Sequence, residues 1–525
     1  LDRLGAGRYI MHRGLRAFVQ LKVKEIAWGD YELGTSADAS KVSERYRKHY
    51  LRLVMTRKQM LVGPTARAAC AEIQREWRAV RNAWLQAVAE GQLDLLEKTL
   101  EGLTRFLLLV GWLWEGERIL HATSTALLRQ SRDVGGSLLM ARILAHRARA
   151  LNVQRRGEEG VAAAQAALDS MPNGSGLEAP ARAAEAEALV EWGRGLSLQG
   201  EFQLATERLK QALTLTGDDQ AVETKARAFH SLGVIALSTE SYEEALAYLR
   251  RALALYDVMD HRTGGAAVGN DLGMAAIRQR QYPDAAAYLG DALSLAQKTG
   301  DRRQEGVAYS HFGRLAAAQG DYDRATGHLE RALRIAIDLG DRYVQAEVQV
   351  ELAASLLHQG ETGQAWKRSI LAVEISHALG ERASEARAWL VAGHVFSELN
   401  MLDQATRSCR MALELARTFG GSMLITEALA CLARIGLARD DLGRARSLVE
   451  QILGRLETQS LPGGSEALRV YLICYQVLKA AKDSRADDVL SRVSSLYGQE
   501  EGGASVHYSP NGGSELPDGE DVPRL

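Results

Sequence analysis

The chain has 525 residues, a net formal charge of −2, 46% hydrophobic residues and 25% charged residues. The composition is ordinary for a globular protein, and the length is well past the size at which one hydrophobic core keeps growing. The charge gives no basis for nucleic acid as a direct partner, because neutralising phosphates requires a clear basic excess. No apolar run approaches the ~20 residues that span a bilayer, so no membrane segment is expected.

The four cysteines are widely spaced and form no C-x-x-C pair: Cys70, Cys409, Cys431 and Cys474. This usage favours a reducing compartment over a disulfide framework or a zinc site. We therefore predict a cytoplasmic protein. The chain opens with Leu1 rather than Met, which indicates a fragment or a processed product.

At the start of the chain, residues 7–18 read Gly-Arg-Tyr-Ile-Met-His-Arg-Gly-Leu-Arg-Ala-Phe. They resemble the wing strand and following helix that end the winged-helix subdomain of bacterial signal-transducing ATPases of the STAND or NB-ARC-like kind. An R-Y-x-x-H-x-x-L-R-x-F pattern recurs there, and the resemblance implies a nucleotide-binding core upstream. We predict that residues 1–60 are the end of such a winged-helix-like subdomain with a linker helix. The alternative is that they are simply more helix.

Residues 61–180 are expected to form degenerate helical pairs. Residues 76–84, Glu-Trp-Arg-Ala-Val-Arg-Asn-Ala-Trp, resemble the helix that begins the repeat region of the same ATPases. Residues 106–128 then indicate an early helical pair. A stretch rich in Pro, Gly and Ser at residues 171–180 marks a break before the regular part of the chain.

The strongest signal is a period of forty residues. A small residue recurs at this spacing seven times, at Gly193, Gly233, Gly273, Gly313, Ala353, Gly393 and Ala433. An alanine follows each of them after twelve residues, from Ala205 to Ala445. We interpret each unit as two antiparallel helices that cross at these positions, because a large side chain would overpack the crossing.

These columns, with an aromatic residue before the second helix as at Phe202, Tyr242, Tyr282 and Tyr322, resemble the tetratricopeptide repeat, whose usual period is 34 residues. The longer unit resembles the repeats attached to STAND-type ATPases. The predicted fold is all-α, a right-handed superhelical α-solenoid of tetratricopeptide-like helix hairpins. The regular array covers residues 181–498 and ends in capping helices, since an atypical last unit is what a cap requires. Residues 499–525 are expected to be a disordered acidic tail.

The sequence contains none of the common catalytic motifs. It has no G-x-x-x-x-G-K-[ST] phosphate-binding loop, no G-x-S-x-G elbow and no H-E-x-x-H pair. Cysteines and histidines do not cluster at metal-ligand spacing. We therefore predict that the chain is not an enzyme and has no cofactor, no metal site and no catalytic residue.

The resemblance implies that the first helix of each repeat lines a concave groove. The positions that would point into it are Arg194, Arg227, His230, Asn270, Arg278, Ser310, Arg314, His358, Arg387, His394 and Arg434. Several arginines on one wall suit a ligand that carries carboxylate or phosphate, because guanidinium forks bind such groups bidentately. The alternative is that any solenoid groove is solvated and therefore polar.

Two functions follow from the resemblance. The first is a sensor or regulatory module of a STAND-type ATPase, active in transcription regulation or defence signalling, which binds a protein or a small-molecule inducer. The second is a free-standing adaptor scaffold for protein–protein assembly. An unrecognised enzyme is a distant third. The fragment is expected to be a monomer.

Overall fold

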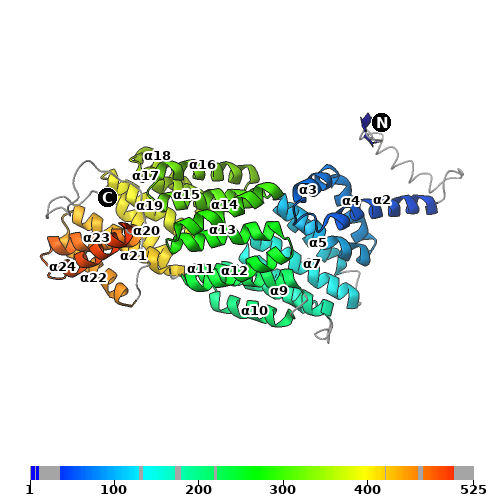
Figure 1. Cartoon of the computed structure of the whole chain (residues 1–525), viewed down its shortest axis with the longest axis horizontal. Coiled ribbons are helices and arrows are strands. Elements are labelled where there is room, and N and C mark those ends of the chain that lie inside the picture. Colours follow the sequence, from blue (N-terminus) through cyan, green and yellow to red (C-terminus); the bar gives the residue numbers. More distant parts are fainter. Residues whose placement is uncertain are drawn as a thin grey trace. The chain divides into compact units, whose positions relative to one another are not determined.

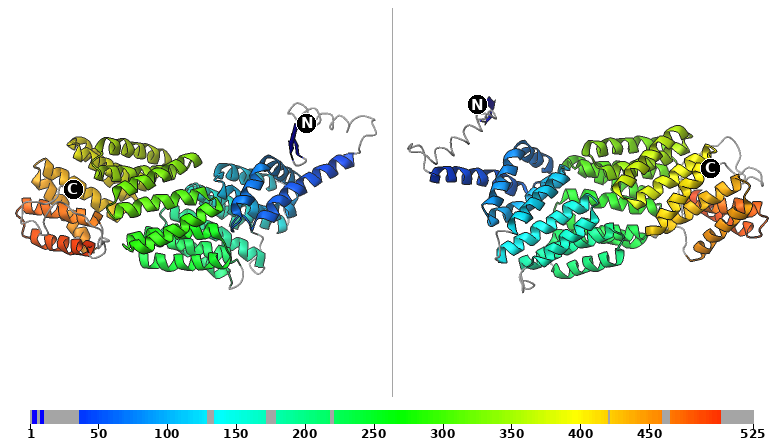
Figure 2. Two further views of the ribbon diagram at one scale, coloured as in Figure 1. Left: turned by 45° about the horizontal axis from the view of Figure 1, so that its top comes forward. Right: turned by 180° about the vertical axis from the view of Figure 1, so that it is seen from behind.

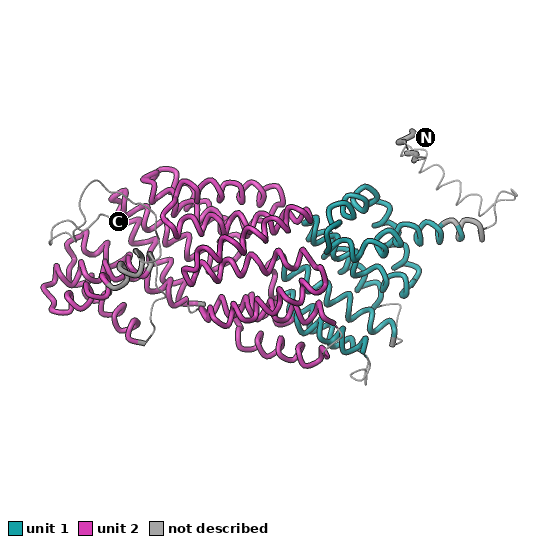
Figure 3. The backbone as a smooth tube through the Cα atoms, in the orientation of Figure 1, with its two compact units in different colours: residues 1–154, 159–191 teal, residues 155–158, 192–525 magenta. Residues whose placement is uncertain are grey.

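The structure is a computed structural model that describes residues 2–5, 8–10, 36–128, 134–171, 179–217, 221–419, 421–458 and 465–501. The chain forms two compact units (Figure 3). Unit 1 contains residues 1–154 and 159–191, and unit 2 contains residues 155–158 and 192–525. No helix in these described ranges is both long and apolar enough to cross a bilayer.

Unit 1 begins with two short antiparallel strands, β1 (Asp2–Gly5) and β2 (Arg8–Ile10). Its helices are α2 (Ser36–Arg57), α3 (Ala66–Arg75), α4 (Trp77–Ala89), α5 (Leu93–Leu109), α6 (Leu113–Leu127), α7 (Val134–Val153) and most of α8 (Gly157–Asp169). Residues 11–35, which contain the predicted helix after the wing, lie outside the described part. The winged-helix resemblance therefore stays a prediction.

Aromatic side chains contribute to the unit 1 core, which consists mostly of aliphatic residues. Trp84 is fully buried on α4, and its indole Nε1 donates a hydrogen bond to Thr123 Oγ1 on α6 at 2.9 Å. Trp77, Phe106 and Trp112 pack against one another with ring centroids 5.4–5.9 Å apart. The segment of residues 76–84 singled out in the sequence thus supplies core residues of this unit.

Unit 2 contains helix pairs that follow one another along the chain (Figures 1 and 2). The first helices are α9 (Ala179–Leu198), of which residues 179–191 belong to unit 1, and then α11 (Val222–Ser238), α13 (Arg262–Arg278), α15 (Arg302–Ala318), α17 (Arg342–His358), α19 (Arg382–Glu398) and α21 (Ser422–Ala438). The second helices are α10 (Phe202–Leu215), α12 (Tyr242–Val258), α14 (Tyr282–Thr299), α16 (Tyr322–Leu339), α18 (Thr362–Leu379), α20 (Leu402–Phe419) and α22 (Leu442–Thr458). The predicted all-α solenoid of helix hairpins is confirmed.

The small residues of the forty-residue period lie where the two helices of a pair cross. A Cβ atom added to Gly273 on α13 would come within 2.5 Å of Leu289 Cδ2 on α14. The same leucine position faces Gly233 and Gly313, which would meet Leu249 and Leu329. The predicted reason for the small residue is therefore correct: a leucine of the second helix occupies the space.

The residue that faces the small position changes with it. It stands sixteen residues further on and is fully buried in every repeat: Leu209, Leu249, Leu289, Leu329, Ser369, Cys409 and Val449. Where the small residue is Ala353 or Ala433 instead of glycine, this position holds serine or valine instead of leucine, and only Gly393 among the glycines faces a residue other than leucine, Cys409. The extra methyl group on one helix is thus matched by a smaller side chain on the other, as close packing requires.

The turns inside the helix pairs are also periodic. A residue with positive φ stands at positions 200, 240, 280, 320, 360, 400 and 440. It is glycine at three of them and Glu240, Arg280, Asn400 and Asp440 at the others, with φ between 57° and 61°. A residue with a side chain pays a steric cost in this region of backbone space, and glycine does not.

The first helices form the inner row of the array. From α11 to α21 each first helix packs against the next first helix. Among the described helices, no second helix packs to a similar extent against the next second helix. A stack whose inner row is closer together curves toward that row, so the first helices provide the concave side on which repeat arrays bind partners.

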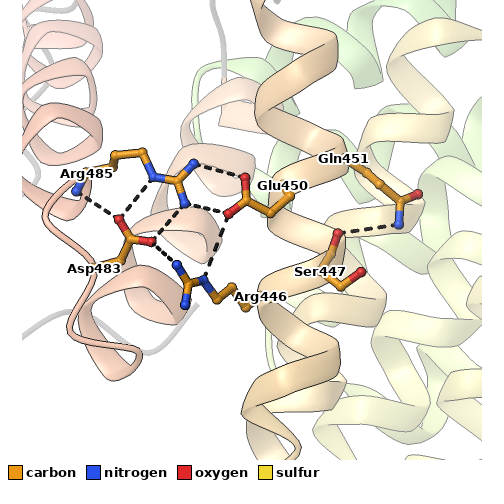
Figure 4. A network of polar contacts seen from close by, with 6 residues as sticks. All are labelled: Arg446, Ser447, Glu450, Gln451, Asp483 and Arg485. Atoms are coloured by element: carbon orange, nitrogen blue, oxygen red, sulfur yellow. Dashed lines mark hydrogen bonds and ion pairs between the residues drawn. The ribbon is translucent and has the colours of Figure 1, made fainter.

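The array continues into α23 (Ser465–Ala480) and α24 (Ala486–Glu501), and a charged network ties their connecting turn to α22 (Figure 4). Arg485 donates to both carboxylate oxygens of Glu450, at 2.9 and 2.5 Å, and Nη2 of Arg446 lies 2.9 Å from Asp483. Helix α24 runs three residues past the predicted end of the array. The rest of the predicted tail, residues 502–525, lies outside the described part.

One pairing was not foreseen. Cys409 of α20 and Cys431 of α21 form a disulfide with their Cα atoms 6.5 Å apart, and neither Cys70 nor Cys474 takes part in it. The sequence predicted no disulfide framework, and this pair corrects that expectation. Its 22-residue separation carries no recognisable motif. Only the packing of α20 against α21 brings the two thiols together.

Gly273→Trp is expected to lower the free energy of unfolding by about 3 kcal/mol or more, because the indole would have to displace Leu289 at the helix crossing. The matched control is Gly290→Trp on the exposed side of α14, where an added Cβ meets nothing within 4 Å. Chemical denaturation measures both variants. Equal unfolding of the two would show that the phase of the helix crossing is wrong.

Glu240→Gly is expected to raise the free energy of unfolding by about 0.5–1 kcal/mol, since Glu240 is exposed and its φ is 60°. The reciprocal change, Gly320→Glu at the equivalent turn with φ 78°, should lower it by about 1 kcal/mol. Thermal or chemical unfolding checks the pair, and opposite signs are required.

Candidate ligand-binding face

All eleven residues predicted to line the groove lie on first helices. Arg194 is on α9, and the others follow on α11, α13, α15, α17, α19 and α21. The inner row of these helices is called the first-helix face below. The structure does not gather the eleven residues into one site. It places seven of them in three groups along this face, two of which are dense in charge. Arg278 acts electrostatically on Glu351 of the second group, whereas Arg194, Arg227 and Ser310 are not among the residues of these groups.

In the first group the predicted residues connect neighbouring repeats. His230 Nε2 lies 2.6 Å from Asp271 Oδ2. Asn270 is buried and donates from Nδ2 to the carbonyl oxygen and the side-chain oxygen of Gln304, at 3.1 and 3.0 Å. His311 Nδ1 contacts the carbonyl oxygen of Asn270 at 3.0 Å. These contacts join neighbouring first helices, so we assign this group to the packing of the repeats. Asn270 Oδ1 is a buried atom without a hydrogen-bond partner in the described part of the chain.

The second group is an alternating set of charges in the middle of the array. Glu351 on α17 accepts a hydrogen bond from Arg314 Nε on α15 at 3.1 Å and another from Arg387 Nη2 on α19. Arg314 Nη2 lies 3.8 Å from Glu347 Oε1. The predicted arginines of three consecutive first helices are therefore joined through carboxylates of α17.

The electrostatics of this group favour ionised carboxylates. Burial by itself would raise the pKa of Glu351, but Arg314 and Arg387 outweigh it and lower the pKa to about 2. Burial likewise opposes the ionisation of Glu347, and the same two arginines with Arg155 lower its pKa. Both side chains are thus anions at neutral pH.

An arginine from outside the repeats reaches this group. Arg155, which belongs to unit 2, places its guanidinium carbon 3.9 Å from the centre of the Tyr343 ring on α17. Burial would lower the pKa of Arg155, but Tyr343, Glu347 and Glu381 raise it. Its backbone has φ 64°, an unfavourable conformation for arginine. The first-helix face thus holds a cationic side chain in a cation–π contact.

The third group is at the end of the face toward α23. Arg434 donates from Nη1 to Glu398 at 2.8 Å, and its Nη2 lies 3.4 Å from His394 Nδ1. Arg469 on α23 places Nη2 3.4 Å from His358 Nε2. The ring of His358 stacks on Tyr322, with centroids 4.5 Å apart and planes 8° from parallel. The structure therefore brings together three predicted residues, His358, His394 and Arg434.

The ionisation of His394 follows from these neighbours. Burial lowers the pKa of His394 well below its ordinary value, and Arg469, Arg434 and His358 lower it further. The imidazole is consequently neutral at neutral pH. It can serve as a hydrogen-bonding group but adds no positive charge of its own.

Sequence reasoning missed Tyr343, Glu347, Glu351, Arg155 and Arg469. Part of the signal was available, because Glu347 occupies the repeat position of Arg227 and Arg387, and Glu351 that of Asp271. The sequence prediction included basic residues at these repeat positions and left out the acidic residues at the same positions. Arg155 and Arg469 lie outside the regular repeats, so the forty-residue period does not indicate where their side chains lie. In the ranges that the structure describes, no group of three or more His, Cys, Asp or Glu side chains is placed to hold a metal ion.

Comparison with known proteins agrees with this architecture. Two models of the tetratricopeptide repeat match residues 226–257 and 266–338, which lie within α11 to α16. The chain therefore contains tetratricopeptide repeats, and such helix pairs form a scaffold that binds other proteins. No curated protein matches the chain in sequence.

Solved structures are similar to this chain at low sequence identity. A Rap protein complexed with competence and sporulation factor is 13% identical with a TM-score of 0.53, over 69% of this chain and 99% of that chain. NprR in complex with its cognate peptide NprX is 13% identical with a TM-score of 0.49, over 68% and 99%. A STAND protein with a tetratricopeptide-repeat sensor from Pyrococcus horikoshii is 15% identical with a TM-score of 0.44, over 74% of this chain and 53% of that chain. At these identities the likeness concerns the fold alone.

Glu351→Gln is expected to lower the free energy of unfolding at pH 7 by about 1–3 kcal/mol, because Arg314 and Arg387 lose their shared carboxylate. The folded pKa of Glu351 is depressed from 4.5 to about 2. Its contribution is therefore complete above pH 4.5 and is lost as the pH falls toward 2. The difference between the wild type and the variant should shrink over that interval.

Denaturation curves at several pH values measure this difference. The control is Glu330→Gln at an exposed position of α16, which should change stability by less than about 0.5 kcal/mol at every pH. A Glu351→Gln effect that is independent of pH would contradict the assigned charge interaction.

Proposed function

We propose that the chain is the ligand-binding sensor module of a STAND-type signal-transducing ATPase, with transcription regulation or defence signalling as its output. In this proposal a protein or a small-molecule inducer binds the first-helix face. Binding shifts the coupled ATPase between a resting and an active state. The module itself performs no catalytic step and acts in the cytoplasm.

The observation that carries the binding part is the occupation of the first-helix face by Arg155. The face is not merely solvated: Tyr343 holds the guanidinium of a residue that does not belong to the repeats, beside Glu347. A face that contacts an arginine from outside the repeats through an aromatic ring has the chemistry to bind side chains of a partner.

The link to an ATPase is supported by the sequence of residues 7–18 and by the forty-residue length of the repeats. The NprR and Rap structures are each of a complex with a peptide or a factor, and a peptide is accordingly one of the partners we consider. The free-standing adaptor remains the competing function. It requires only the repeats and no switch.

The proposal predicts a P-loop of the form G-x-x-x-x-G-K-[ST] in the same reading frame upstream of Leu1, directly after a strand. Sequencing that frame is the measurement. A start codon just before Leu1 would instead make the chain an adaptor, and removal of residues 1–60 would then leave partner binding intact.

A further inference from the structure

An arginine of the chain itself occupies part of the first-helix face. Arg155 lies in the turn between α7 and α8, outside the regular repeats, and its guanidinium carbon is 3.9 Å from the centre of the Tyr343 ring on α17. Both residues belong to unit 2. The contact therefore shows, within one compact unit, a place on this face that accepts a guanidinium group.

Two carboxylates accompany the ring at this place. The Tyr343 hydroxyl donates a hydrogen bond to Glu347 Oε1 at 3.1 Å, which fixes that acid beside the ring. Glu381, the residue before α19, acts on Arg155 together with Glu347. An aromatic ring attracts a cation to its face, and carboxylates accept the N–H donors of a guanidinium group. The three side chains thus combine the two kinds of contact that an arginine forms best.

Glu381 differs from the residues at the same position in the two preceding repeats. Asp301 and Asp341 cap α15 and α17 by accepting backbone hydrogen bonds. In the part of the chain that the structure describes, the side chain of Glu381 makes no such bond to α19. Burial raises the pKa of Glu381, Arg155 lowers it, and Glu347 raises it. The two carboxylates therefore oppose each other's ionisation, and a cation is needed to stabilise both.

Arg155 is not the residue that joins the first helices here. The contacts between α15, α17 and α19 run through Arg314, Glu351 and Arg387. Departure of Arg155 would leave these contacts in place, but Glu347 and Glu381 would lose the cation on which both act. Another guanidinium group can therefore replace Arg155 without disrupting the packing of the repeats.

We propose that Tyr343, Glu347 and Glu381 form a binding site for an arginine side chain of a protein partner, and that Arg155 occupies this site in the free chain. A polypeptide is the expected source because the present occupant is itself an arginine presented on a turn. The partner has to displace Arg155, so its arginine competes with a group of the chain. This inference deepens the ligand-binding function proposed above and rests on it for the identity of the partner.

The site can be tested on the whole chain with a blocked arginine, N-acetylarginine amide, as the probe. Isothermal titration calorimetry is performed at low ionic strength, because salt screens such contacts. Arg155→Gln should bind the probe about tenfold more tightly than the wild type, since an intramolecular competitor acts at a high effective concentration. The matched control, Arg417→Gln at an exposed position of α20, should bind it like the wild type. The neutral analogue N-acetylcitrulline amide should show no saturable binding.

Further variants in the Arg155→Gln background separate the parts of the site. Tyr343→Leu and Glu381→Gln should each weaken binding of the probe by about tenfold. Tyr343→Phe retains the ring and should weaken binding less than Tyr343→Leu. If folded Arg155→Gln does not bind the probe saturably, or binds citrulline equally well, the proposal is wrong.

A comparison with free arginine tests the source of the guanidinium group. Tighter binding of free arginine than of the blocked probe would overturn the protein partner in favour of a small guanidine compound. None of these results depends on an ATPase. A missing P-loop upstream would remove the sensor function and leave this site standing.

A second measurement on the wild-type chain decides the case in which Arg155→Gln fails to fold. The chain is labelled with fluorotyrosine, and the fluorine NMR signals of Tyr343 and of Tyr50 on α2 are assigned by their loss in the respective Tyr→Phe variants. Blocked arginine at high concentration should shift the Tyr343 signal saturably and leave the Tyr50 signal unchanged. An unchanged Tyr343 signal, or equal shifts of both, would contradict a site at this place.

Discussion

The close crossing of two helices within each repeat is the constraint on which the rest of unit 2 depends. A small residue of the first helix meets a buried side chain of the second, sixteen residues later, and the two vary together. Glycine faces leucine in the most regular repeats, whereas Ala353 and Ala433 are matched by Ser369 and Val449. Gly393 is opposed by Cys409, so both residues of that pair are small. In all seven repeats the first-helix position is glycine or alanine and the facing residue is fully buried, which permits the close approach of the two helices.

Once the crossing is fixed, the forty-residue phase places equivalent positions of every first helix on one face. The fold therefore decides where a side chain lies, and the individual repeat decides its charge. Glu351 lies between Arg314 and Arg387 for this reason: three consecutive first helices present opposite charges at neighbouring positions of one inner row. Burial makes such groups costly alone and stabilising together. Charges on the first-helix face thus hold the repeats together as well as preparing a binding surface.

The two charged groups of this face have different chemistry. The central group is balanced by its own carboxylates and accommodates Arg155, whose backbone is held in the left-handed region. The group toward α23 contains two arginines and two histidines, and Arg434 there binds Glu398. Arg155 has a positive φ like the residues in the turns of the repeats, and its distinguishing feature is the cation–π contact with Tyr343 on the first-helix face.

The sequence by itself determined the repeat, its phase, the helix crossings and the face on which the candidate residues lie, because each of these repeats every forty residues and is enforced by local sterics. It could not determine which of the eleven candidates meet, since that depends on contacts between repeats. His230 and Asn270 proved to be packing groups, while His358, His394 and Arg434 converged. The contacts of Arg155 and Arg469 and the Cys409–Cys431 disulfide could not be predicted from the sequence for the same reason. They join segments outside the period or at irregular spacing, and only the folded chain brings such segments within reach of one another.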